Sequence, residues 1–149
     1  MRFRLDPRET TDEASRLAWV DEVAEAAARE AVARGLAEED VYYLSAAIRE
    51  ALMNALSHGR SSDGEPWVRV DVGCQGASKL VVTVRDQGPG FDPQSVPDPV
   101  SPECCGRSHG RGLFFMRRFT DRLSFAFPGP GGSLVRLEKR LPARADPPA

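Results

Sequence analysis

The chain has 149 residues, of which 41% are hydrophobic and 28% are charged. This length and apolar content predict a single globular domain with a hydrophobic core. A formal net charge of −2 argues against a nucleic-acid binder, because such proteins usually present a basic face. No apolar stretch approaches the ~20 residues of a membrane-spanning helix, and the N-terminus lacks a signal-peptide core. We therefore expect a cytosolic protein without a membrane anchor.

The three cysteines do not form a disulfide framework, because their number is odd and Cys104 is adjacent to Cys105. Reduced thiols in a reducing compartment fit this pattern better. Cys104, Cys105 and His109 also cluster, but three zinc ligands within six loop residues would be cramped. Reduced cysteines are therefore the main expectation, and a zinc site is the minor one.

The N-terminal part of the chain predicts a strand followed by a helix. Arg2–Leu5 alternates in polarity and is typical of a short edge strand. An alanine-rich helix is expected from Asp12 to Arg34, with acidic residues in its first turn and Gly35 as its stop. Its apolar residues, which include Leu17 and Val32, recur with helical period and are expected to face the core.

The middle of the chain predicts a second helix, two strands and a long loop. The helix is expected from Glu38 to Ser57, and Gly59 ends it. Trp67–Val72 and Leu80–Arg85 alternate or are rich in β-branched residues, which is typical of strands. Residues 92–109 are rich in Pro, Ser and Gly, and a loop of that length is usually functional.

The C-terminal part predicts a short helix and a strand hairpin. The helix is expected over Gly112–Phe119, and the strands over Asp121–Phe127 and Ser133–Leu141, joined by a Pro/Gly-rich turn. Residues 1–141 then form one domain, and the Pro/Ala-rich residues 142–149 are expected to be a disordered tail. The element order predicts an α+β two-layer sandwich, in which helices cover one face of a mixed, mainly antiparallel sheet.

A polar row follows the second helix. Glu50, Asn54 and His58 are four residues apart and so project from one side, where Ala51 and Ala55 leave room for a ligand. An amide oxygen is a suitable neutral ligand for a magnesium ion that phosphates already bind. A carboxylate one turn earlier can accept a proton from an attacking hydroxyl group. The alternative is an ordinary solvated helix face.

The second motif follows a hydrophobic strand. Asp86 ends the strand, and Gly88 and Gly90 come directly after it. A buried carboxylate can accept a hydrogen bond from an exocyclic amine such as that of adenine. The glycines permit a tight turn and let a flat base approach the backbone. A common Asp-Gly turn explains the same residues equally well.

The third motif opens the short helix. Gly110, Arg111 and Gly112 precede its first turn, where free backbone N–H groups and the positive end of the helix dipole favour phosphate. The motif is not a Walker loop, because the Gly-Lys-Ser/Thr ending is absent. A glycine pair is weak by itself, so the order of all three motifs carries the prediction.

The order of the motifs resembles the GHKL ATPase superfamily, which includes gyrase, Hsp90, histidine kinases and MutL. Glu50–His58 is similar to its N box, Asp86–Phe91 to its G1 box and Gly110–Leu113 to its G2 box. Residues 92–109 would then be the ATP lid. Gly132-Ser133 matches a further element of the superfamily, usually Gly-Thr, in which the threonine hydroxyl helps to hold adenine through water. Here serine replaces threonine and keeps the hydroxyl. The resemblance implies the Bergerat ATP-binding fold with ATP and Mg²⁺ as cofactors.

Within that superfamily the chain most resembles the bacterial anti-sigma factor serine kinases. Their N box, Glu-Ala-x-x-Asn-Ala-x-x-His, is matched by Glu50–His58 without a mismatch. The resemblance implies a serine/threonine protein kinase that binds a sigma factor and phosphorylates a STAS-type antagonist, in a partner-switching system. It also implies a homodimer.

Each motif residue then has an expected role. Glu50 is the catalytic residue that orients or deprotonates the serine hydroxyl, and Asn54 holds magnesium. Asp86 selects adenine with the help of Ser133. The remaining nucleotide-binding residues admit the base or contact the phosphates, and they are Gly88, Gly90, Gly110, Arg111, Gly112 and Leu113.

Two other functions remain open. A histidine-kinase-like ATPase domain would need a phosphoacceptor histidine on a dimerisation helix, but the only histidines, His58 and His109, map to the nucleotide site or its lid. A module that binds nucleotide or a partner without catalysis is the second alternative. Glu50 and Asn54 are both present, which favours a kinase.

Overall fold

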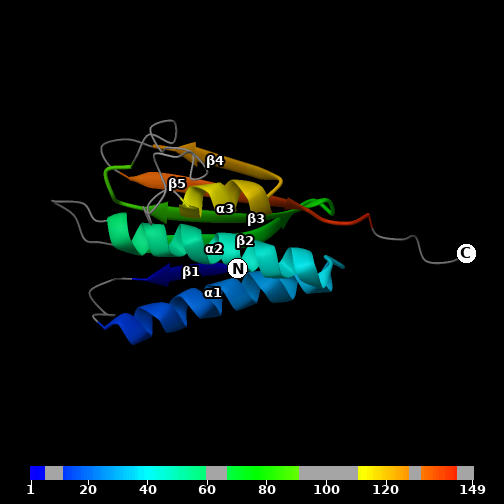
Figure 1. The fold of residues 1–149 in the computed structure, drawn as a ribbon, viewed down its shortest axis with the longest axis horizontal. Coiled ribbons are helices and arrows are strands. Elements are labelled where there is room, and N and C mark those ends of the chain that lie inside the picture. Colours follow the sequence, from blue (N-terminus) through cyan, green and yellow to red (C-terminus); the bar gives the residue numbers. More distant parts are fainter. Residues whose placement is uncertain (6–11, 60–66, 91–110, 128–131, 144–149) are drawn as a thin grey trace, which may run out of the picture.

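The computed structural model describes residues 1–5, 12–59, 67–90, 111–127 and 132–143, except the side chain of Arg111 (Figure 1). Within these ranges each predicted helix and strand is present, with ends within three residues of those expected. The elements are β1 (Arg2–Leu5), α1 (Glu13–Ala33), α2 (Glu38–His58), β2 (Val68–Gln75), β3 (Lys79–Asp86), α3 (Arg111–Phe119), β4 (Arg122–Ala126) and β5 (Ser133–Arg140). Three predictions fall outside the described residues. They are the minor zinc site at Cys104, Cys105 and His109, the lid over residues 92–109, and the disordered tail over residues 144–149.

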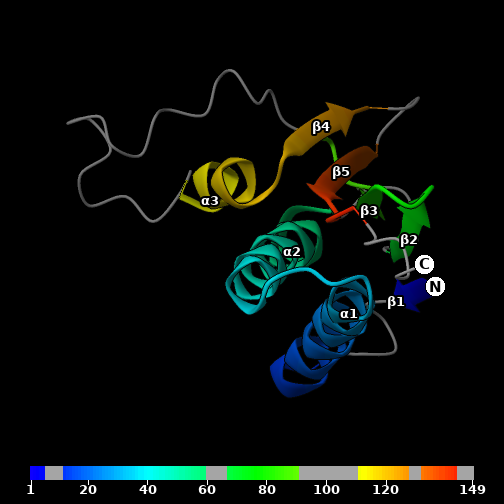
Figure 2. The same ribbon diagram turned by 90° about the vertical axis from the view of Figure 1, so that its right-hand side faces the viewer.

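The strands form one sheet in the order β1-β2-β3-β5-β4. Each of the four described strand pairs is antiparallel, so the mainly antiparallel sheet is confirmed and no parallel pair occurs among the described strands. β1 lies at the edge, as its short length and the nearby Pro7 predicted. The three described helices lie on one side of the sheet (Figure 2). The predicted α+β two-layer fold is therefore correct.

Helix α1 begins and ends at the residues that its sequence signals indicate. The Asp12 carboxylate accepts hydrogen bonds from the backbone N–H and the hydroxyl of Ser15, at 2.8 and 2.7 Å, and caps the first turn. These hydrogen bonds hold the pKa of Asp12 below its usual range. Gly35 follows the helix with a φ of +82°, a left-handed conformation that glycine adopts without steric cost.

The predicted apolar face of α1 was too broad. Val32 is 60% exposed and Leu17 is 44% exposed, so neither belongs to the core. The buried stripe runs along Val20, Val23, Ala24, Ala27 and Ala31. Val32 comes one residue after Ala31, and the 100° turn between consecutive helix residues rotates its side chain away from that stripe.

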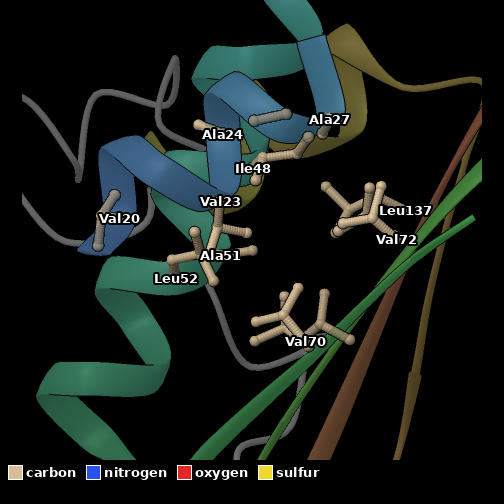
Figure 3. Packing of buried hydrophobic residues seen from close by; sticks show 14 of the residues in the cluster. Val20, Val23, Ala24, Ala27, Ile48, Ala51, Leu52, Val70, Val72 and Leu137 are labelled. Atoms are coloured by element: carbon tan, nitrogen blue, oxygen red, sulfur yellow. The ribbon is translucent and has the colours of Figure 1, made fainter. Parts of the chain in front are cut away.

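The core lies where α1 and α2 pack on the sheet. Figure 3 shows side chains of α1 meeting Ile48, Ala51 and Leu52 of α2, with Val70 and Val72 of β2 and Leu137 of β5 on the side of the sheet. Small alanines on both helices allow the two backbones to approach closely. Helix α2 contacts α1 on one flank and α3 on the other, so the helix that carries the polar row is held on several sides (Figure 2).

A search of the described helices finds none that is long and apolar enough to cross a membrane.

We expect Ile48→Ala to lower the free energy of unfolding by about 2–5 kcal/mol, because it removes a large side chain from a fully buried position. Val32→Ala removes apolar volume from an exposed helix position and should change the same quantity by less than about 0.5 kcal/mol. Urea unfolding followed by circular dichroism measures both. Equal losses would mean that the core does not lie where the structure places it.

Candidate functional site

The first and third motifs meet where α3 begins. A Cβ placed on Gly112 would lie 2.6 Å from Oε2 of Glu50 and 3.8 Å from Nδ2 of Asn54. Both of these α2 side chains are partly exposed, so they remain open to a ligand. The structure therefore brings a carboxylate, an amide and the first turn of a helix together, as the sequence predicted.

Stacked aromatic rings hold α3 in this position. Phe119 at the end of α3 stacks on Tyr43 of α2, with ring centroids 4.6 Å apart, and on Phe115 at 5.5 Å. Met116 on the same helix is buried. Because α3 packs along α2, its first turn is aimed at Glu50 and Asn54, and its free N–H groups face the same space.

The carboxylate of Asp86 lies at the end of β3 and is 7% exposed. Its Oδ1 accepts a hydrogen bond from the backbone N–H of Gly88 at 2.8 Å, and its Oδ2 accepts one from the hydroxyl of Ser133 at 2.6 Å. Ser133 stands directly opposite Asp86 on the neighbouring strand β5. A carboxylate has about four acceptor sites, so these two bonds orient it and leave capacity for a further donor such as an amine.

The first and second motifs meet at Gly59, a residue that the sequence indicated only as the end of α2. Its φ of −81° is open to any residue, so a left-handed turn does not explain the glycine. A Cβ there would lie 2.6 Å from Cβ of Asp86 and would also collide with the carbonyl oxygen of Ala55. Gly59 is needed because the end of β3 packs directly on the end of α2.

The turn after β3 packs closely on its neighbours. A Cβ on Gly88 would collide with the carbonyl oxygen of His58 and lie 2.8 Å from Cα of Gly59. Gly90 has a φ of +74°, and a Cβ there would lie 2.5 Å from the ring of Phe127. The N–H of Gly132 donates to the carbonyl oxygen of Gly88 at 2.6 Å. These contacts explain both glycines of the turn, while their expected role in admitting a base stays a prediction.

The remaining motif residues are only partly described. Gly110 lies outside the described residues, and Arg111 begins α3 with a side chain that is not described. Leu113 is buried in the core cluster, so only its backbone N–H is suited to a phosphate. His58 is exposed in the last turn of α2, where a cation is favoured.

The donor set beside α3 fits a magnesium ion that a nucleotide brings with it. Mg²⁺ usually takes one or two protein oxygens together with phosphate oxygens and water. Asn54 offers its side-chain amide at this place, beside the Glu50 carboxylate. Among the described residues no group of three or more His, Cys, Asp or Glu could hold a metal by itself. A magnesium bound here would therefore depend on the phosphates.

We expect Gly59→Ala to lower the free energy of unfolding by about 1–3 kcal/mol, because the new methyl group meets a backbone oxygen and the Asp86 side chain, and the backbone cannot move away cheaply. Gly73→Ala on β2 is the matched control. A Cβ there meets nothing within 4 Å, so this change should be neutral or stabilise by up to about 1 kcal/mol. Thermal and urea unfolding of both variants test the contact, and an unaffected Gly59→Ala protein would contradict it.

The family comparison covers the elements that form this site. The sequence model of the histidine kinase-like ATPase domain matches residues 14–139. The structure of the RsbU and RsbW domains of Rv1364c from Mycobacterium tuberculosis aligns over 97% of this chain and 34% of that chain, with 20% sequence identity and a TM-score of 0.47. This chain thus spans about a third of that chain's length. No curated protein matched. Because the matched residues run from the start of α1 almost to the end of β5, the chain belongs to the histidine kinase-like ATPase family.

Proposed function

We propose that the protein is a serine/threonine protein kinase of the anti-sigma factor type, which uses ATP and Mg²⁺. Family membership supports an ATP-using kinase in general terms. The finer proposal is supported by the N box from Glu50 to His58, which matches the anti-sigma kinase pattern without a mismatch. The observation that carries it is the contact of Gly112 with Glu50 beside Asn54, because this contact brings a carboxylate suited to accept a proton next to a helix end suited to bind phosphate.

Adenine would be recognised at the end of β3. Gly88 and Ser133 already donate to the two oxygens of Asp86 and hold its carboxylate in one orientation. A third donor, the exocyclic amine of adenine, would find a remaining acceptor site there. Guanine presents a carbonyl oxygen at the corresponding position, which would face the carboxylate unfavourably. The site therefore favours ATP over GTP.

The phosphates would lie over the first turn of α3. The N–H groups of Gly112 and Leu113 have no partner within the helix and carry the positive end of its dipole. Gly110 and the Arg111 side chain are proposed to add to this site. Asn54 would hold Mg²⁺, which offsets the negative charge of the phosphates when it is bound.

Glu50 would act on the protein substrate. Its carboxylate lies beside Gly112 and is partly exposed, so it can face both the phosphates and an incoming hydroxyl group. In the proposed reaction the serine oxygen bonds to the γ-phosphorus, the bond to the bridging oxygen of ADP breaks, and Glu50 accepts the hydroxyl proton. Gly112 has no side chain that would displace the carboxylate from this position.

The partners proposed for this reaction are those of a partner-switching system. By resemblance, the protein would bind a sigma factor and phosphorylate a STAS-type antagonist in the cytoplasm, as a homodimer. The site itself requires only a substrate segment with an accessible serine or threonine that can approach Glu50.

Asp86→Asn tests the adenine site. We expect ATP affinity to fall about tenfold or more, because the amide nitrogen removes an acceptor from a buried site, whereas the weak GTP affinity should change little. Calorimetric titrations with and without Mg²⁺ measure both nucleotides. Asp71→Asn, on the other face of the sheet, is the matched control and should bind ATP as the parent does. Equal losses for ATP and GTP would contradict a role in base selection.

Glu50→Gln tests the catalytic role. Transfer of labelled γ-phosphate to a STAS-type protein should fall about 10²–10⁴-fold, because the amide cannot accept the hydroxyl proton. ATP affinity should remain within about twofold of the parent value, since Glu50 does not lie at the proposed adenine site. Glu39→Gln, an exposed position in the first turn of α2, is the control. A large loss of ATP binding in Glu50→Gln would show that Glu50 binds nucleotide rather than acting as the base.

A further inference from the structure

The sheet has a second face, which no described helix covers (Figure 2). Side chains alternate between the two faces along each strand. Lys139 of β5 forms an ion pair with Asp40 of α2, and Cys74 of β2 contacts Glu30 of α1, so these positions belong to the helix side. The residues that alternate with these positions along each strand point to the opposite side, and we call that surface the outer face.

The outer face is strongly basic. Strands β1 and β2 contribute Arg2, Arg4 and Arg69. The other three strands contribute Lys79, Arg85, Arg122, Arg136 and Arg140. Only two carboxylates in the strands, Asp71 and Glu138, lie among these eight cations. The rest of the sequence then carries 12 Lys or Arg and 20 Asp or Glu, so the strand residues of this face are basic whereas the remaining sequence is acidic.

Three of the arginines form one row across the sheet. Arg4 of β1 stands opposite Arg69 of β2, which in turn stands opposite Arg85 of β3. Like charges that face each other directly across strands are destabilising. Within the described part of the chain, none of the three forms an ion pair with a carboxylate, and the Arg69 guanidinium lies 5.3 Å from the centre of the Trp67 ring. An anionic ligand would relieve this repulsion.

Three of the other five cations of the face are already partnered. Arg2 pairs with Asp71 at 2.7 Å, and Arg136 and Lys79 pair with Glu138 at 2.8 and 3.1 Å. Hydrogen bonds from Arg136 and Lys79 hold the pKa of Glu138 below its usual range, so this carboxylate stays ionised at neutral pH. Five cations of the face thus have no carboxylate partner among the described residues, and three of them stand side by side in the Arg4–Arg69–Arg85 row, apart from Arg122 and Arg140.

An open hollow of about 510 Å³ lies beside the row. Val81 and Thr83 form part of its floor, Arg2 and Arg136 lie at its sides, and Gly73 has open space where a side chain would stand. Mixed apolar and charged lining suits the side chains of a protein better than a uniform polyanion.

We propose that the outer face is a docking surface for an acidic segment of a partner protein, whose carboxylates pair with Arg4, Arg69 and Arg85. A second copy of this chain is disfavoured as a face-to-face partner, because each copy would bring the same excess of positive charge. Nucleic acid is also disfavoured. The whole chain has a net charge of −2, which works against a long polyanion that would extend beyond the basic face.

This surface is separate from the nucleotide site. Asp86 points to the helix side of β3 and its neighbour Arg85 points to the outer face, so the sheet lies between the two sites. The proposal goes beyond the kinase function, because a partner docked here would leave Glu50, Asn54 and Asp86 accessible to nucleotide.

The test compares Arg69→Gln/Arg85→Gln with a control that removes one cation from α1 and one from its C-cap, Arg29→Gln/Arg34→Gln. The probe is a short fluorescein-labelled peptide of Asp and Glu residues, titrated by fluorescence anisotropy in low salt. The sheet variant should lose about tenfold or more in affinity, because two charge-assisted contacts disappear, and the control should stay within about twofold. Affinity of the parent should fall as salt rises.

Amide NMR spectra of the parent locate the peptide and should show shifts in β1, β2 and β3. Thermal unfolding confirms that both variants fold, and the loss of like charges should not lower the unfolding midpoint of the sheet variant.

No binding of the peptide by the parent, or equal losses of affinity in both variants, would overturn the proposal. Tighter binding of an oligothymidylate of equal charge would overturn it in favour of nucleic acid. ATP titrations of the same proteins separate this result from the kinase proposal, since ATP affinity should be equal in all three.

Discussion

The site depends on the packing of the end of strand β3 against the end of helix α2. Asp86 fills the space that a side chain would occupy at Gly59, and Gly88 lies against the carbonyl oxygen of His58. No side chain separates the two elements at this point, so the carboxylate that would bind adenine is held at a fixed place relative to α2. Glu50 and Asn54 lie on that same helix. The proposed adenine site and the proposed catalytic residue are therefore both positioned by α2.

Helix α2 is positioned by contacts on several sides. Ile48 and Leu52 anchor it to the core, and Lys139 of β5 pairs with Asp40 in its first turn. On its far flank, the stacking of Tyr43 on Phe119 brings α3 alongside it. The N–H groups of α3 then face side chains that already have a fixed position. Preorganisation of this kind is what phosphoryl transfer requires, since the protein contributes mainly orientation and electrostatic stabilisation.

The two faces of the sheet differ in chemical character. The helix side is apolar and ends in the buried Asp86, whereas the outer face carries most of the strand arginines. A net charge of −2 for the whole chain conceals this separation, because the acidic residues lie mainly outside the strands. The net charge describes the average electrostatic field of a protein, but a binding partner contacts one local surface, whose charge can differ from that average.

The sequence by itself determined the elements and the chemistry of the motifs. Helical and strand periods are local properties, so the limits of α1, α2 and the strands followed from nearby residues, as did the cap at Asp12 and the turn at Gly35. Only the tertiary structure decided that Gly59 is required by Asp86, that Gly112 lies against Glu50, and that Leu17 and Val32 of α1 are exposed. It alone also placed Arg4, Arg69 and Arg85 in one row. Each of these facts depends on which distant segments meet, and strand order, register and helix packing are set by the whole core rather than by any local pattern.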